Sequence, residues 1–464
     1  MRQTLLLAAA LCLPGAALAQ GSANLDRASR NPTAPAKTVA ESSAASAASV
    51  AASSVAAEIP FSEILNRPDD VGLNERYALQ RIRAGDLRGA ATTLERVLLV
   101  DPTRYRTRLL YGVVLVRLDD VADAALELDR VLATPALPRE TRDEAEAYER
   151  LVRSRRRLSH FDARLTLGLG FDDNRNAAPN SGTRLIQGTP FQLTDDSRRK
   201  ADSNLQFVGS LGASRQVWGA TGDQVFARFT YYRAEQKVYD LLNLQAYSPK
   251  AGAVLRTRWA DVTPSLSFDH VLLSQSSYLR SRNADLRVER RLSDRWSAWF
   301  EFGHSYQDFL DTPRVAGASG RTGDQLDWTL GTAWSPDPLD RLTLTALHRR
   351  KYAQDVAAYA YRRESVGAQW LRLLGRGRFA TLGVTGQFDR YEIPDPSVEP
   401  GVVRHDDAVV VDLLYGQPLD LLWSRLRNLE ASVGYEYFYE GSTVVNYEYS
   451  NNKATAFVTY KWGI

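Results

Sequence analysis

The chain has 464 residues, 44% of them hydrophobic, and a formal net charge of only +3. A charge this small gives no reason to expect nucleic-acid binding, and the length allows two or three domains. The single cysteine is Cys12, near the start of the chain, so we expect neither a disulfide nor a cysteine-based metal site in the remainder.

Residues 1–19 have the pattern of a secretory signal peptide. An apolar run follows Arg2, and Ala17-Leu18-Ala19 forms a small-residue cleavage site. Residues 20–60 are rich in Ala and Ser with scattered Pro, a composition that cannot bury a core, so we expect a disordered linker. No later stretch approaches ~20 consecutive apolar residues, and we therefore expect no membrane-spanning helix.

Residues 61–158 are predicted to be helical and contain a repeat with a period of 34 residues. Apolar and small residues recur at that spacing: Tyr77, Ile82, Leu87, Ala90, Leu94 and Val97 match Tyr111, Val116, Val121, Ala124, Leu128 and Val131. The spacing of Ala90, Leu94 and Pro102 resembles the tetratricopeptide (TPR) repeat. Small residues there let paired helices approach closely, so we interpret these positions as packing residues, with a helix at 141–157 capping the stack.

That last helix ends in Arg153-Ser154-Arg155-Arg156-Arg157, immediately before the first predicted strand. Cations complement the negative end of a helix dipole at a solvated terminus. The same residues also suit a basic collar against anionic lipid headgroups. Both interpretations stay open.

Residues 159–464 divide into fourteen short segments of alternating polarity. They lie near 160–172, 203–216, 223–235, 247–259, 262–274, 279–292, 295–308, 325–335, 341–353, 359–373, 378–391, 407–418, 428–440 and 453–464. In the thirteenth, one face carries Leu429, Ala431, Val433, Tyr435, Tyr437 and Tyr439, and the other carries Glu430, Ser432, Gly434, Glu436 and Glu440. Such repeated alternation predicts a closed fourteen-stranded antiparallel transmembrane β-barrel with an apolar outer face and a polar lumen.

The gaps between segments indicate the orientation of the barrel. We expect them to alternate strictly, with long gaps such as 173–202 and 392–406 after odd-numbered strands and tight ones such as Gly375-Arg376-Gly377 after even-numbered strands. An even strand count brings both barrel ends to one rim, so we expect a periplasmic helical domain and extracellular long loops. Tryptophans near strand ends suit interfacial girdles: Trp218, Trp259, Trp296 and Trp462.

The sequence gives little support for an enzyme. Its five histidines are scattered, and in Gly303-His304-Ser305 adjacent side chains on a strand point to opposite faces, so they cannot form a catalytic Ser–His pair. Asp172-Asp173-Asn174 offers oxygen ligands for Ca²⁺, but a turn at a loop entry explains the triplet better. We predict no catalytic, cofactor-binding or metal-ligating residue and no cofactor, and the substrate-binding residues are unknown.

The predicted lumen carries charges of both signs. Its inward-facing residues on the last two strands include Glu430, Glu436, Glu440, Thr455, Thr459 and Lys461. A mixed-charge interior favours a wide or plugged path over a selective anion channel.

This arrangement resembles the surface lipoprotein assembly modifier (Slam) family of type XI secretion translocons. The resemblance covers residues 61–464 and consists of a short TPR-like periplasmic domain, preceded by a signal peptide and followed by a fourteen-stranded barrel. The local match is the exit of the first strand, Asp172-Asp173-Asn174-Arg175-Asn176, which is similar to the family's Gly/aromatic–Asp–Asn–x–Asn opening of the barrel.

The resemblance implies an outer-membrane translocon of a Gram-negative bacterium that delivers specific lipoproteins or secreted proteins, such as haem- or metal-binding ones, to the cell surface. The TPR-like domain would receive cargo beneath the pore. The implied partners of this monomer are outer-membrane lipids, the cargo, periplasmic chaperones and the barrel assembly machinery. A TPR-barrel exopolysaccharide exporter, with Glu436 and Trp299 on an inward ladder, and a general porin or channel stay open as alternatives.

Overall fold

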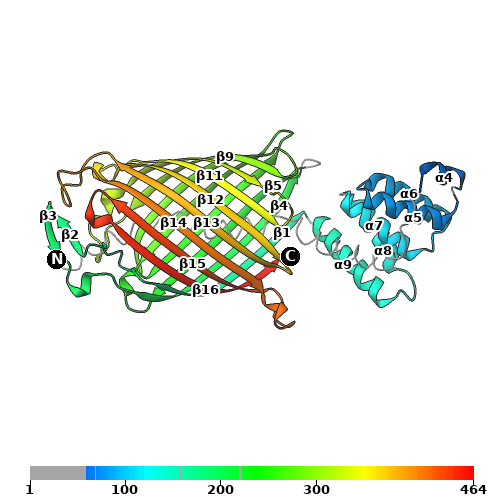
Figure 1. Cartoon of the computed structure of the whole chain (residues 1–464), viewed down its shortest axis with the longest axis horizontal. Helices are drawn as coiled ribbons and strands as arrows, with labels where there is room; N and C mark the ends of the chain where they lie inside the picture. Colours follow the sequence, from blue (N-terminus) through cyan, green and yellow to red (C-terminus); the bar gives the residue numbers. More distant parts are fainter. Residues whose placement is uncertain (1–58, 68, 119, 157, 219–221, 464) are drawn as a thin grey trace. The chain divides into compact units, whose positions relative to one another are not determined.

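The computed structural model describes residues 59–463 except 68, 119, 157 and 219–221. It contains two compact units, a helical one that ends at Leu158 and a barrel that begins at Ser159 (Figure 1). The predicted signal peptide, residues 1–19, and the predicted linker up to residue 58 lie outside the described residues.

Six α-helices form the described part of the helical unit (Figure 1). They are α4 (Phe61–Asn66), α5 (Val71–Arg83), α6 (Leu87–Val100), α7 (Tyr105–Arg117), α8 (Val121–Leu132) and α9 (Arg139–Arg156). Aspartate side chains cap three of these helices by accepting hydrogen bonds from backbone N–H groups of the first turn: Asp70 caps α5, Asp86 caps α6 and Asp120 caps α8. Gly85, with φ of +81°, forms the turn between α5 and α6 in a backbone conformation that favours glycine.

The repeated apolar residues form the core of the helical unit. Fully or almost fully buried are Ala90, Leu94, Val97, Ala124, Leu128 and Val131. Their predicted packing role is therefore confirmed. Between α7 and α8, the buried carboxylate of Glu127 accepts hydrogen bonds from Arg108 and Arg130, both at 2.6 Å, so its charge is compensated.

Fourteen antiparallel strands in the described part of the chain close into a barrel (Figure 1). They are β1 (Ser159–Asp172), β4 (Asp202–Trp218), β5 (Asp223–Gln236), β6 (Leu244–Arg256), β7 (Asp261–Leu273), β8 (Ser276–Arg291), β9 (Trp296–Phe309), β10 (Gly323–Trp334), β11 (Asp340–Lys351), β12 (Tyr361–Gly375), β13 (Arg378–Tyr391), β14 (His405–Pro418), β15 (Leu429–Ser442) and β16 (Tyr449–Gly463). Each strand pairs with the next along the chain, and β1 closes the barrel against β16. The predicted fold, a helical region followed by a fourteen-stranded barrel, is confirmed.

The outer face of the barrel is apolar and the inner face is polar. On β1, Leu165, Leu167 and Leu169 are 46%, 58% and 65% exposed, while the alternate residues Thr166 and Gly168 are buried. Because the side-chain period is two, one face of each strand can meet hydrocarbon while the other lines the interior. The chain therefore forms a transmembrane β-barrel of the outer-membrane type.

The predicted girdle tryptophans lie at or next to strand ends or, for Trp259, in the turn between β6 and β7. Trp259, Trp296 and Trp462 are exposed, and the ring of Trp296 stacks on that of Trp334 with centroids 5.7 Å apart. The side chain of Trp218 lies outside the described residues. Among the described helices, none has the length and apolar character needed to cross a membrane.

The prediction of strictly alternating gaps is wrong at two places. We call the rim at which β1 ends the loop rim and the opposite one the turn rim. On the loop rim, β7 and β8 are joined by only Ser274 and Gln275, which have φ of +46° and +68°. A two-residue turn with two positive φ angles matches the twist of a hairpin, but glycine or asparagine usually signals it. On the turn rim, residues 419–428 form a long connection instead of a tight turn.

Candidate functional site

The inner wall of the barrel carries paired charges. The side chains that were predicted to face the lumen do so: Glu430, Glu436, Glu440, Thr455, Thr459 and Lys461. Lys461 donates to Glu430 at 2.6 Å, and Lys453, also on β16, donates to Glu436 at 2.8 Å. These acidic groups are thus tied to the wall by cations on the adjacent strand.

Arginine–aspartate pairs continue this pattern near the loop rim. Arg349 and Arg363 lie directly opposite each other on β11 and β12. Arg349 donates two hydrogen bonds to Asp327, at 2.8 and 2.7 Å, and Arg363 donates two to Asp389, both at 2.6 Å. Two-pronged pairs of this kind fix both side chains. These parts of the inner wall therefore carry rigid ion pairs whose opposite charges cancel locally.

Large aromatic side chains of the inner wall pack against glycines of the adjacent strand. A Cβ atom on Gly331 would come within 2.1 Å of the Trp299 ring, and one on Gly168 within 2.2 Å of the Phe457 ring. Trp299 is only 4% exposed, and the Arg287 guanidinium carbon lies 4.6 Å from its ring centroid. Trp299 is therefore part of the wall and presents no open face for stacking a sugar.

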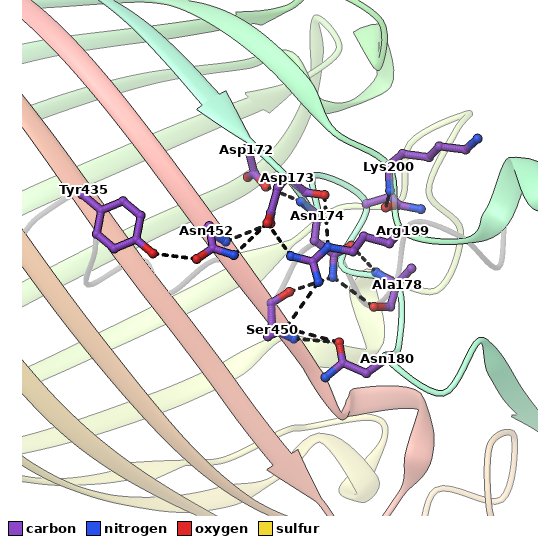
Figure 2. A network of polar contacts seen from close by, with 11 residues as sticks. Asp172, Asp173, Asn174, Ala178, Asn180, Arg199, Lys200, Tyr435, Ser450 and Asn452 are labelled. Carbon is purple, nitrogen blue, oxygen red and sulfur yellow. Dashed lines mark hydrogen bonds and ion pairs between the residues drawn. The ribbon is translucent and has the colours of Figure 1, made fainter.

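The loop between β1 and β4, residues 173–201, is fastened to the last strand by the Asp–Asn segment (Figure 2). The Asp173 carboxylate accepts hydrogen bonds from the backbone N and Nδ2 of Asn452, at 2.8 and 2.7 Å, and is paired with Arg199. Burial alone raises the pKa of Asp173, but these donors outweigh it and hold the pKa below the usual 3.8. The group is therefore a fixed anion that joins the first loop to β16.

The neighbouring asparagines complete this anchor. Asn174 donates through Nδ2 to the carbonyl oxygens of Ala178 and Ser450, both at 3.0 Å (Figure 2). Asn176 donates to the Arg198 carbonyl at 2.8 Å and accepts from the Lys200 backbone N at 3.0 Å. Each amide thus bonds to backbone groups that lie far away in the sequence.

The Asp172-Asp173-Asn174 triplet consequently serves the loop-entry turn. Its oxygens accept hydrogen bonds from protein donors, including Asp172 Oδ1 from the Asn174 N at 3.0 Å. Among the described residues, no group of three or more His, Cys, Asp or Glu side chains is arranged to hold a metal ion.

The same loop runs along the loop rim and contacts two other loops. It contains a separate hairpin of β2 (Thr183–Ile186) and β3 (Thr189–Gln192). The backbone of Leu185 exchanges two hydrogen bonds with the Asn446 side chain, at 2.6 and 2.9 Å. At the hairpin tip, the backbone N of Gly188 donates to the Val398 carbonyl at 2.9 Å. The first loop therefore links the loops before β14 and before β16.

His304 does not pair with Ser305. His304 bonds to Asp324 at 2.8 Å, on the opposite face of β9 from Ser305, as the alternation predicts. The structure does bring together one pair that the sequence did not suggest: His270 Nε2 lies 2.8 Å from Ser277 Oγ. A register shift between Val271 and Leu272 creates this approach. No described carboxylate or amide bonds to the second nitrogen of His270, so the pair lacks the orienting group of a triad.

The basic segment at the end of α9 is described only at its start. Arg153 is exposed and pairs with Glu149 on the preceding turn, donating through Nε at 2.7 Å. Residue 157 and the side chains of residues 154–156 lie outside the described residues, so the solvated-terminus and lipid-collar interpretations are not distinguished.

Comparison with known proteins yields distant likenesses. No protein-family model matches the chain, and no curated protein matches it. Solved structures that are similar include Pseudomonas aeruginosa OpdQ, with 9% identity and a TM-score of 0.34 over 66% of this chain and 100% of that one. Others are P. aeruginosa OprD, with 12% identity and a TM-score of 0.36 over 66% and 95%, and a loop-deletion mutant of Vibrio cholerae OmpT, with 10% and 0.37 over 66% and 100%. Likeness at this level carries no conclusion about function.

Proposed function

We propose that this chain is an outer-membrane conduit whose lumen passes polar cargo. The observation that carries the proposal is the barrel wall itself, which is apolar outside and lined inside by ion pairs of both signs, such as Arg363–Asp389 and Lys453–Glu436. Such a wall can stay hydrated without binding one sign of ion tightly. In this proposal the turn rim and the helical unit face the periplasm, and the loop rim faces outward.

We further infer that the cargo is a polypeptide received by the helical unit. Stacked helix pairs present extended surfaces that bind other polypeptides. Attached to a barrel by a short connection, such a unit raises the local concentration of cargo at the pore. This arrangement favours a translocon for surface or secreted proteins.

A general channel for small polar solutes is the second candidate. It is favoured by the polar wall, because a water-filled barrel needs a polar interior, but it gives the helical unit no role. The exopolysaccharide exporter is less favoured, because Arg287 covers Trp299 and Lys453 holds Glu436. Neither residue is free to form a sugar-binding ladder.

One complementation experiment separates these candidates. A deletion strain receives either the full chain or a variant that lacks residues 61–156 but keeps the signal peptide and the barrel. The readouts are the surface-shaved and secreted proteome, extracellular polysaccharide, and conductance of each purified protein in planar bilayers.

For a translocon, the full chain restores particular proteins to the cell surface, whereas the truncated variant leaves them in the periplasm although its barrel conducts. For a general channel, both purified forms conduct and the surface proteome never changes. Loss of polysaccharide in the deletion strain would instead support the exporter.

A further inference from the structure

A row of three arginines, continued by His405, crosses the outer face of the barrel at the loop rim. Arg350 of β11 lies opposite Arg362 of β12. Arg362 in turn lies opposite Arg390 of β13, and Arg390 lies opposite His405 of β14. Each lies at or one residue from the end of its strand. Like charges directly opposite on antiparallel strands destabilise a sheet, so this arrangement calls for a compensating anion.

The protein compensates this row only at its flanks. Arg350 pairs with Glu392 at 3.1 Å, and Arg390 pairs with Asp407 at 2.7 Å. Arg362, between them, is exposed, and no described residue forms a hydrogen bond or an ion pair with its side chain. The nearest carboxylate on the same face of β12, Glu364, is engaged by His348 at 2.6 Å. The central cation of the row is therefore uncompensated.

Beyond the adjacent layer, which contains Glu364 and His348, the surface toward the middle of the barrel is apolar. Val366 of β12 is 62% exposed, and Val384 and Phe388 of β13 are 44% and 41% exposed. In a membrane these side chains contact acyl chains. An anion that reaches Arg362 alongside them is therefore the headgroup of a lipid, and the planar guanidinium matches phosphate through two parallel hydrogen bonds.

We propose that Arg350, Arg362 and Arg390 form a binding site for the phosphate of an acylated glycolipid in the outer leaflet. Arg362 contributes the free charge, and its two neighbours supply additional N–H donors. In the orientation proposed above, the loop rim lies at the level of those headgroups. The bound lipid would seat the strands β11 to β13 at a fixed depth in the membrane.

The test uses the full chain in detergent micelles. Native mass spectrometry measures binding of hexa-acylated lipid A with both phosphates, and of the same lipid after enzymatic removal of its phosphates. We expect the phosphorylated lipid to bind and Arg362→Gln to weaken it about tenfold, since a hydrogen bond to a charged group contributes roughly that much. The matched control is Arg290→Gln, an exposed arginine on the outer face of β8 at the turn rim, which should bind as the wild type does.

Heat-modifiable migration in gels shows whether each variant is folded. Arg362→Lys keeps the charge but loses the planar guanidinium that can form two parallel hydrogen bonds with phosphate. An affinity between those of the wild type and Arg362→Gln would support the proposed geometry. Equal binding of the dephosphorylated lipid to the wild-type chain would overturn the proposal without reference to any variant. So would equal losses for Arg362→Gln and Arg290→Gln.

Discussion

Asn174 offers the most direct test of the first-loop anchor. Its side chain is 1% exposed, donates to the carbonyl oxygens of Ala178 and Ser450, and accepts from the Ala178 N, each at 3.0 Å. Asn174→Ala removes these three hydrogen bonds and leaves their backbone partners unsatisfied. At about 1 kcal/mol per hydrogen bond, the anchor loses about 3 kcal/mol of local stability.

A loss of that size raises the population of the detached loop roughly a hundredfold. Trypsin cuts after arginine, and Arg198 and Arg199 lie within the loop. When opening and closing are fast, cleavage follows the opened population. We therefore expect initial cleavage of residues 173–201 to accelerate by roughly a hundredfold in the folded barrel.

The matched control is Gln192→Ala, which removes one exposed hydrogen bond to Thr183 within the same loop. We expect it to change the cleavage rate by no more than about fivefold. If Asn174→Ala were cut no faster than this control, the side chain would not hold the loop, and the reasoning would be refuted.

Two further substitutions test the barrel wall and the helical unit. Gly331→Leu drives a side chain into the Trp299 ring; we expect the free energy of barrel unfolding to fall by about 1–3 kcal/mol, and an unchanged urea midpoint would contradict this packing. Burial raises the pKa of Glu144 above 4.5, with Glu140 adding to the effect. The folded unit thus binds protons more tightly than the unfolded chain, and its stability declines as pH rises through this range. Glu144→Gln should therefore raise the melting temperature of the helical unit at pH 7 but leave it unchanged well below pH 4.5. Equal effects at both pH values would contradict the raised pKa of Glu144.

The barrel was predictable because its strands face two solvents. Hydrocarbon outside and water inside impose a period of two on every strand. The predicted faces of segment 428–440 accordingly reappear in β15, where Val433 and Tyr435 are exposed and Ser432 is buried. Predicted strand ends differ from the observed ones by a few residues, as between segment 359–373 and β12 (Tyr361–Gly375), because the pattern weakens where a strand leaves the membrane.

The missed features depend on long-range pairing and on turns without a sequence signal. Ser274 and Gln275 adopt left-handed conformations without being glycine or asparagine. His270 meets Ser277 only because of a register shift. Asn174 bonds to Ser450 across 276 residues, so its partner is fixed only when the barrel closes.

The contacts of the Asp172–Asn176 segment limit what its resemblance to the Slam family implies about function. Its residues bond to Ser450 and Asn452, so they fasten the first strand to the last at the seam where the barrel closes. That pairing spans the greatest sequence separation in the barrel and carries the largest loop-closure cost. A segment that stabilises the seam is useful to any barrel of this build, whatever passes through it. If the proposed translocon is correct, the selection of cargo is better sought in the helical unit, where the deletion of residues 61–156 probes it without disturbing the seam.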